Sequence, residues 1–200
     1  MAKIIGLTGG IATGKSTVSN MFLDEDIPVI DTDEIAKNLF AKDSETYQEV
    51  LDAFGEEILT PSEEINRNKL AKIIFNNKEA REKLNKIVHP KVKERVFTEV
   101  KRFELEGQSL IVVDVPLLFE SSFDEFMDFT ILVYAKRENQ IDRLKMRDNI
   151  DESYALKKIK SQMPMTEKKK KADFVIDNSH SILSTKKRFK KCLDKIKEAE

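Results

Sequence analysis

The sequence predicts an α/β fold, a five-stranded parallel sheet flanked by helices, from three observations. Five short runs rich in isoleucine and valine lack polar alternation, as strands buried on both faces do. Segments with helical periodicity separate these runs, an order typical of a parallel sheet. The chain has 200 residues, 40% of them hydrophobic, which suits one domain with insertions. The predicted strands are 3–8, 28–31, 110–115, 129–135 and 173–177.

The uneven spacing of the strands predicts two helical insertions. A long, charged segment with helical patterning separates the second strand from the third, which favours an inserted subdomain over a structureless loop. A second, basic segment precedes the last strand. We therefore expect a core of about 1–33, 102–135 and 173–200, and helical insertions of about 34–101 and 136–172.

The last segment of the chain, 181–200, is expected to form an amphipathic helix that packs on the core. Its predicted inward side chains are Ile182, Phe189, Leu193 and Ile196.

Composition excludes several classes of protein. The 35 basic and 36 acidic residues give a net charge of −1, which does not drive binding to nucleic acid or to a membrane. The lysines near the C-terminus are expected to be mostly solvated faces of helices. A nucleic-acid surface is disfavoured there, because no stacking aromatics alternate with these lysines. The single Cys192 excludes a disulfide scaffold and is expected to pack in a helix. Without a signal peptide or a membrane-spanning run, the default expectation is a cytoplasmic protein.

A phosphate-binding loop follows the first strand. Residues 9–16 match the pattern G-x-x-x-x-G-K-[ST], with a strand before them and a helix after. Glycines let backbone N–H groups reach phosphate oxygens, the lysine reaches the β- and γ-phosphates, and the hydroxyl ligates Mg²⁺. The predicted ATP-binding residues are Gly9, Gly10, Ile11, Ala12, Thr13, Gly14, Lys15, Ser16 and Thr17.

The metal site is expected at Ser16 and Asp114. Asp114 ends the third strand, where an acid is expected beside the metal; the alternative is an ordinary aspartate in a turn. The guanine-reading motif Asn-Lys-x-Asp is absent, which argues against a GTPase.

Two further groups of charged residues have open interpretations. Asp31 and Asp33 follow the second strand, where either could orient an acceptor hydroxyl, while Asp33 could equally cap the next helix. Arg143 and Arg147 lie four residues apart on one helix face, so they could both bind phosphates. On the residues alone, a surface pair compensated by neighbouring aspartates is the simpler interpretation.

Taken together, these motifs resemble the dephospho-coenzyme A kinase family of P-loop kinases over nearly the whole chain. The departures are mild: Ala12-Thr13 stands where Gly-Ser or Ala-Ser is frequent, and Thr32 where Ala is usual. The segments that carry the resemblance are Leu7-Thr8-Gly9-Gly10-Ile11, Gly14-Lys15-Ser16-Thr17, Val29-Ile30-Asp31-Thr32-Asp33, Ile35-Ala36, Arg67-x-x-Leu70, Val88-His89-Pro90, Asp114-Val115-Pro116-Leu117-Leu118-Phe119-Glu120, Arg143-Leu144, Arg147-Asp148, Ser161-Gln162-Met163-Pro164, Glu167-Lys168 and Ala172-Asp173-x-Val175-Ile176-Asp177-Asn178.

The resemblance implies ATP-dependent phosphorylation of the ribose 3′-hydroxyl of dephospho-coenzyme A. It assigns the acceptor-side aspartate to Asp33 and the phosphate-binding arginines to Arg143 and Arg147. It makes residues 34–101 the acceptor-binding subdomain and 136–172 a lid. We also expect Mg²⁺ as the cofactor and a monomer or small homo-oligomer.

In the inserted subdomain, the resemblance implies that Arg67 and His89 bind the acceptor. For His89 the alternative is a histidine that fixes a turn before Pro90. Two competing functions remain: a kinase of another small hydroxylic or nucleotide acceptor, and an ATP-dependent switch or nucleic-acid-associated ATPase.

Overall fold

The computed structural model describes residues 1–42 and 44–199, and the chain forms two compact units. One unit comprises Met1–Ile30 and Phe103–Glu200, and the other comprises Asp31–Arg102. The helical insertion expected at about 34–101 falls within the second unit. The segment expected as a lid, about 136–172, belongs to the first unit together with the phosphate-binding loop.

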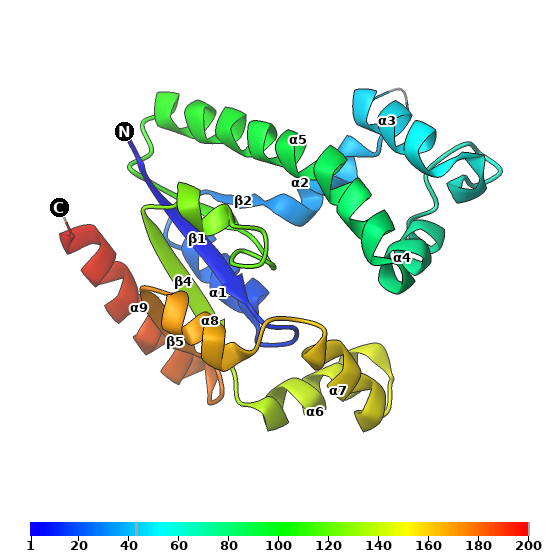
Figure 1. Cartoon of the computed structure of the whole chain (residues 1–200). Helices are drawn as coiled ribbons and strands as arrows, with labels where there is room; N and C mark the ends of the chain where they lie inside the picture. The colour runs from blue at the N-terminus through cyan, green and yellow to red at the C-terminus, as the bar shows by residue number, and fades with distance from the viewer. Residues whose placement is uncertain (43, 200) are drawn as a thin grey trace. The chain divides into compact units, whose positions relative to one another are not determined.

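The five predicted strands form one parallel sheet with the order β2-β3-β1-β4-β5 (Figure 1). β1 is central, and Leu7 pairs in register with Asp114 on one side and Ile131 on the other. Because the strands are parallel, the loops after β1, β3 and β4 leave the sheet at the same edge. The strands are β1 (Lys3–Gly9), β2 (Val29–Asp31), β3 (Leu110–Asp114), β4 (Phe129–Tyr134) and β5 (Phe174–Asp177).

Two helices, α1 (Lys15–Leu23) and α9 (Ile182–Glu198), pack on one face of the sheet and contact each other. Phe22 of α1 meets Phe189 of α9 edge to face, with ring centroids 4.8 Å apart. These rings join a buried cluster that includes Ile5 of β1. Burial of this apolar surface is the main term that fixes α1, and therefore the loop before it, on the sheet.

The segment after β3 packs directly against β1. At Gly6, a Cβ atom would lie 2.8 Å from Met127 Cγ and 3.1 Å from a Leu118 methyl carbon, so a larger residue would push this segment away. The short helix η2 (Phe123–Phe126) lies within it. Three helices stand between β4 and β5 in sequence: α6 (Arg137–Asp148), α7 (Glu152–Lys160) and α8 (Met165–Lys171).

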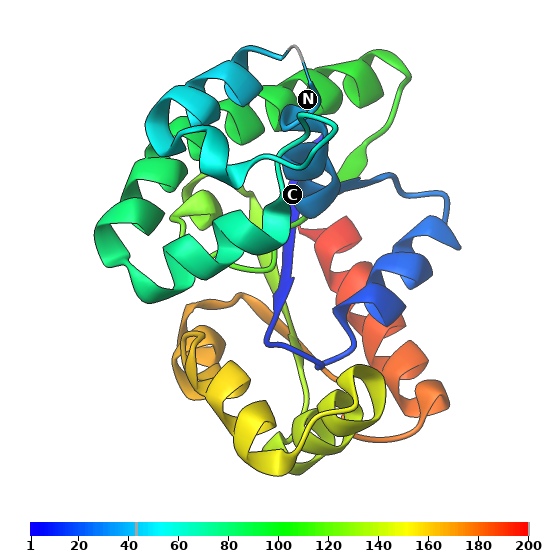
Figure 2. The same cartoon turned by 90° about the vertical axis from the view of Figure 1, so that its right-hand side faces the viewer.

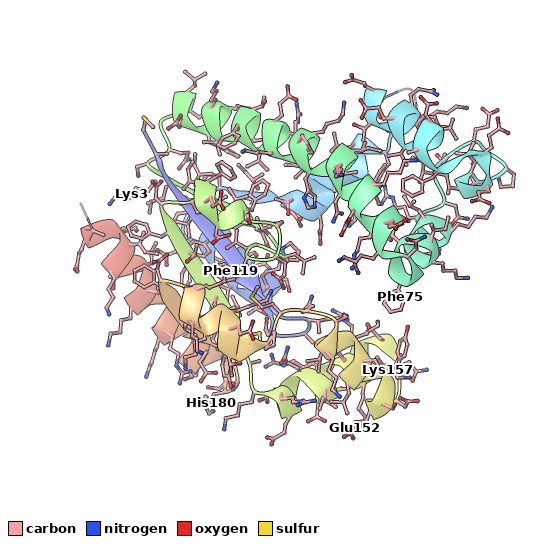
Figure 3. The ribbon with its side chains drawn as sticks, in the orientation of Figure 1. Lys3, Phe75, Phe119, Glu152, Lys157 and His180 are labelled. Carbon is pink, nitrogen blue, oxygen red and sulfur yellow. The ribbon has the colours of Figure 1, made fainter. Side chains whose placement is uncertain are left out.

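The second unit consists of helices. Phe75, labelled in Figure 3, projects from α4 and is 78% exposed. The alternative of a turn before Pro90 is wrong, because both His89 and Pro90 lie inside α5. The buried valines of this helix recur every four residues from Val88 to Val100 and stabilise it across the proline. The elements are α2 (Thr32–Leu39), α3 (Glu45–Phe54), η1 (Glu56–Ile58), α4 (Arg67–Asn76) and α5 (Lys78–Leu105). Among the described residues, no helix is long and apolar enough to span a membrane.

The C-terminal helix is present, with one correction to its predicted face. Phe189, Leu193 and Ile196 are buried as expected, whereas Ile182 is 50% exposed. Ile182 is the first residue of α9, so it precedes the turns of the helix that pack against the sheet. Cys192 is buried within the core cluster, in agreement with its predicted packing role.

We expect the thiol of Cys192 to be unreactive in the folded chain. Burial raises its pKa to about 12, against about 8.5 in an unfolded chain. Since the folded state retains this proton more tightly, its contribution to stability is complete below pH ~8.5 and declines as the pH rises towards 12. A thiol reagent at about pH 8, just below the unfolded pKa, should therefore label the native chain slowly and the urea-unfolded chain quickly. Fast labelling of native protein would contradict this.

Candidate active site: the phosphate-binding loop and its supports

The loop between β1 and α1 forms a hydrogen-bonded turn that leads directly into helix α1. Thr13 is fully buried, and both its backbone N–H and its hydroxyl donate to the Gly10 carbonyl, at 3.1 and 2.8 Å. Gly14 forms the N-cap of α1 with φ of 87°, a left-handed conformation that favours glycine. A Cβ atom on Gly14 would also collide with the amide of Asn178. The loop thus meets the positive end of α1, as a phosphate site requires.

Ala12 adopts φ of 58°, a left-handed conformation that is strained for alanine. We expect Ala12→Gly to raise the free energy of unfolding by about 1 kcal/mol. Urea denaturation measures this, and ATP affinity should change little. A lower midpoint in the variant would show that Ala12 is not strained.

Lys15 and Asp114 form an ion pair at the start of α1. The Lys15 ammonium donates to one carboxylate oxygen of Asp114, and the hydroxyl of Ser19 donates to the other at 2.6 Å. Asp114 is 4% exposed, so its charge is held in place by these partners. The Lys15 side chain is 20% exposed and remains accessible to a nucleotide phosphate.

Arg143 and Asn178 hold the loop on the carbonyl side. The Arg143 guanidinium donates to the carbonyls of Ala12 and Thr13, at 3.3 and 3.1 Å, and to that of Asn178 at 2.8 Å. The side-chain amide of Asn178 also donates to the Thr13 carbonyl at 2.8 Å and accepts from the hydroxyl of Thr185 at 2.9 Å. The positive charge of the Arg143 guanidinium beside these carbonyls polarises the peptide groups and strengthens their N–H groups as donors.

Two glutamine side chains hold the loop at Ile11. Gln140 of α6 donates to the Ile11 carbonyl at 2.7 Å, and the Gln162 side-chain oxygen accepts from the Ile11 N–H at 2.8 Å. Figure 2 shows the blue loop after β1 next to the yellow-green helix α6. Both backbone groups of Ile11 are therefore bound by residues from the segment expected as a lid.

The two arginines of α6 have different surroundings. Arg147 donates to the adjacent Asp148 at 2.7 Å, and Lys158 donates to the same carboxylate at 2.7 Å. The hydrogen bond from the Arg147 guanidinium has the larger effect and that from Lys158 the next, and together they hold the pKa of Asp148 well below its usual value. The structure thus brings Arg143 to the loop and places Arg147 in a surface network.

Asp33 lies in the first turn of α2, and it does not cap this helix. The N-cap is Asp31, whose carboxylate accepts from the N–H groups of Asp33 at 2.8 Å and Glu34 at 3.2 Å. The alternative in which Asp33 caps the helix is therefore wrong, because α2 begins at Thr32, two residues before the start that such a cap requires. Asp33 itself is exposed.

The predicted acceptor residues Arg67 and His89 lie on two other helices of the second unit. Arg67 begins α4, and its guanidinium donates to the carbonyl of Lys37 in the last turn of α2 at 3.0 Å. His89 is an exposed residue of α5, and desolvation by its neighbours lowers its pKa, which favours the neutral imidazole.

The residues near Lys15 fit a magnesium ion that arrives with a nucleotide. Ser16 and Asp114 supply the oxygen donors that Mg²⁺ prefers. The described part of the chain contains no group of three or more histidine, cysteine, aspartate or glutamate residues suited to a metal.

The sequence alone does not identify Ser19 and Gln140 as parts of this site, although helical spacing points to both. Ser19 lies one turn after Lys15 on α1, and Gln140 lies three residues before Arg143 on α6. Each shares a helix face with a predicted site residue.

Fold and site together define a P-loop kinase. A sequence model of the family described as dephospho-CoA kinase matches residues 3–184, and the chain belongs to this family. A dephospho-CoA kinase of Listeria monocytogenes is 46% identical over 187 residues, which cover 94% of each chain. The chain is therefore an enzyme, a phosphotransferase.

Solved structures agree with this assignment. The dephospho-CoA kinase of Campylobacter jejuni has a TM-score of 0.72 at 28% identity, with 98% of both chains covered. A shikimate kinase from Bacteroides thetaiotaomicron has a TM-score of 0.54 at 13% identity, with 98% of both chains covered, and shares the fold.

Proposed function

We propose that the chain transfers the γ-phosphoryl group of ATP to the ribose 3′-hydroxyl of dephospho-coenzyme A, giving coenzyme A and ADP. The observation that carries this proposal is a complete phosphate-binding loop, with Lys15 and Asp114 beside it, in a chain that matches the family over residues 3–184. The reaction is the last step of coenzyme A biosynthesis.

The nucleotide side of the reaction is assigned to the loop. Backbone N–H groups of the loop and the positive end of α1 bind the phosphates. Lys15 moves from Asp114 to a phosphate oxygen when ATP is bound, and it balances the charge that spreads over the transferring group. Arg143 keeps the loop in shape from the carbonyl side and adds positive charge to it.

We propose that the Arg147 guanidinium leaves Asp148 and then binds a phosphate group of the substrate. Its helix, α6, belongs to the proposed lid of residues 136–172. Closure of a lid excludes the water that would otherwise hydrolyse ATP. The exchange of Asp148 for a phosphate oxygen preserves the charge pairing of Arg147.

The acceptor side is assigned to Asp33, Arg67 and His89. Asp33 orients the attacking hydroxyl and accepts its proton, so that transfer is direct and in line, without a phosphoenzyme. Arg67 supplies a positive charge and neutral His89 a hydrogen-bonding group, both suited to the phosphates and adenine of the acceptor.

Ser16 and Asp114 would hold Mg²⁺ on the nucleotide. The ion supplies charge neutralisation at the phosphate oxygens when it is bound. Asp114 would be better able to hold the ion once Lys15 had turned towards phosphate, because one carboxylate oxygen would then be released.

The test is an ADP-release assay with ATP, Mg²⁺ and dephospho-coenzyme A. We expect turnover to depend on this acceptor, and mass spectrometry to find a product that has gained one phosphoryl group. AMP, adenosine and a reaction without acceptor are the controls. Preference for another acceptor would redefine the substrate. ADP release that is indifferent to acceptor, from folded protein that binds ATP, would instead support an ATPase switch.

A further inference from the structure

Lys168 is fully buried, although it begins a run of four lysines. Most lysines near the C-terminus are expected to be solvated, and the other three lysines of this run are exposed. The Lys168 ammonium lies 2.8 Å from one carboxylate oxygen of Glu120 and donates to the other at 3.1 Å. It also donates to the carbonyl of Pro116 at 3.5 Å.

Burial of the Lys168 ammonium is a costly way to join two segments. Removal of this charge from water is unfavourable even beside the carboxylate of Glu120, whose side chain stays 22% exposed, and an apolar side chain of the same size often gives equal or better stability. Stability alone therefore does not account for this pair. Its two members, Lys168 and Glu120, instead hold other parts of the chain in place, along two routes.

The first route from the pair leads to the phosphate-binding loop through Gln162. The carboxylate oxygen of Glu120 that pairs with Lys168 also accepts from the backbone N–H of Met163 at 3.1 Å. The preceding residue, Gln162, accepts from the N–H of Ile11 in the loop at 2.8 Å. Orientation of Glu120 by Lys168 thus fixes the backbone that carries Gln162.

The second route leads to the strand that precedes the loop. The Pro116 carbonyl that accepts from Lys168 also accepts from the hydroxyl of Thr8 at 3.1 Å. Thr8 is fully buried in β1, directly before Gly9. Phe119, labelled in Figure 3, stands next to Glu120, and its ring centroid lies 5.9 Å from the ammonium of Lys171 on α8. α8 is therefore joined to the segment after β3 at several points.

We propose that Lys168 is a positioning residue for the phosphate-binding loop. It acts through Glu120 and Gln162 to hold the N–H of Ile11, and so keeps the loop in the shape that ATP phosphates need. The inference rests on the proposed function only for the identity of the nucleotide, since its first readout is ATP binding without any acceptor. The buried cation contacts no substrate and takes no proton.

The first test replaces Lys168 with methionine and compares it with Lys170→Met, an exposed lysine of the same run. We expect Lys168→Met to weaken ATP binding and raise KM for ATP about tenfold or more, because small displacements of a binding loop have large effects. KM for dephospho-coenzyme A should change less than about twofold, and Lys170→Met should resemble the unmodified chain. Equal changes in both KM values would contradict the proposal.

A double-mutant cycle with Gln162→Met tests the route. If Lys168 acts through Gln162, the two effects on ATP affinity should be strongly non-additive, so that Lys168→Met adds less than about threefold once Gln162 is replaced. Independent, multiplying effects would overturn the assigned route.

The variant Lys168→Met/Glu120→Gln separates positioning from stability. It also removes the carboxylate charge that Lys168→Met leaves without its cation, so we expect its thermal midpoint to recover relative to Lys168→Met. ATP affinity should remain low, because the amide introduced at position 120 lacks the cation that orients it. Recovery of ATP affinity together with the midpoint would show that the pair is merely structural. This variant also provides the test if Lys168→Met fails to fold.

The outcomes for the two proposals are distinguishable. Loss of acceptor selectivity alone, with these ATP effects intact, would contradict the proposed function and leave the role of Lys168 standing. Selective phosphorylation of dephospho-coenzyme A with unchanged ATP binding in folded Lys168→Met would support the proposed function and contradict the role of Lys168.

Discussion

Replacement of Lys15 by alanine should lower kcat/KM for ATP by at least about 10²–10³-fold, the range measured when one group that stabilises a developing negative charge is removed. Both binding and transfer should suffer, because the ammonium contacts phosphates in the ground state and balances more charge in the transition state. Steady-state kinetics at several ATP concentrations, with a direct ATP-binding titration, separate the two contributions.

The design must separate loss of function from loss of fold. Lys15 is one of the partners of the buried Asp114, so its removal leaves that carboxylate with one cation fewer. A circular dichroism spectrum and a thermal midpoint therefore accompany the kinetics. Lys197→Ala, on the exposed face of α9, is the matched control and should have unchanged kinetics. Near-normal kcat/KM in folded Lys15→Ala would refute the role assigned to this lysine.

The sheet could be predicted because parallel strands covered on both faces have a distinctive composition. Residues 110–114 are all buried, and the sequence there is uninterrupted leucine, isoleucine and valine up to Asp114. The phosphate-binding loop could be predicted for a related reason: its glycines and lysine are required by local geometry and by the ligand. Neither prediction depends on which distant residues come into contact.

The hydrogen bonds that support the loop depend on such contacts, and so the sequence alone did not predict them. Lys168 and its neighbours are equally polar, and only the packing of α8 on the segment after β3 decides which of them is buried. Its partner Glu120 is 48 residues away in sequence. Gln140 and Gln162 are likewise ordinary polar residues until the fold brings them to Ile11.

Helix boundaries account for the remaining differences. The position of the first turn of α2 decides whether Asp31 or Asp33 is the cap, and the residue types alone suit both. Similarly, Pro90 predicts a break, but the backbone hydrogen bond that it removes is tolerated inside α5, because the apolar side chains of this helix are buried on both sides of the proline.

Because Asp31 supplies the cap of α2, substitution of Asp33 can test catalysis with little effect on the helix. We expect Asp33→Asn to lower kcat by about 10²–10⁴-fold, the usual contribution of a general base, while ATP binding is retained. The amide has nearly the same shape as the carboxylate, but it cannot accept the proton of the acceptor hydroxyl. Kinetics with saturating ATP and dephospho-coenzyme A, together with an ATP titration, measure the two effects.

Asp31→Asn is the matched control for this experiment. Asparagine caps helices as well as aspartate does, so its side-chain oxygen should still accept from the N–H groups of Asp33 and Glu34, and α2 should remain intact. Removal of the neighbouring charge alone should then reduce kcat less than about tenfold, well below the loss expected of a base. A large loss in Asp31→Asn with a small one in Asp33→Asn would transfer the base to Asp31. A loss under about tenfold in both variants would mean that neither carboxylate accepts the proton, and that orientation by the other groups of the site suffices for transfer.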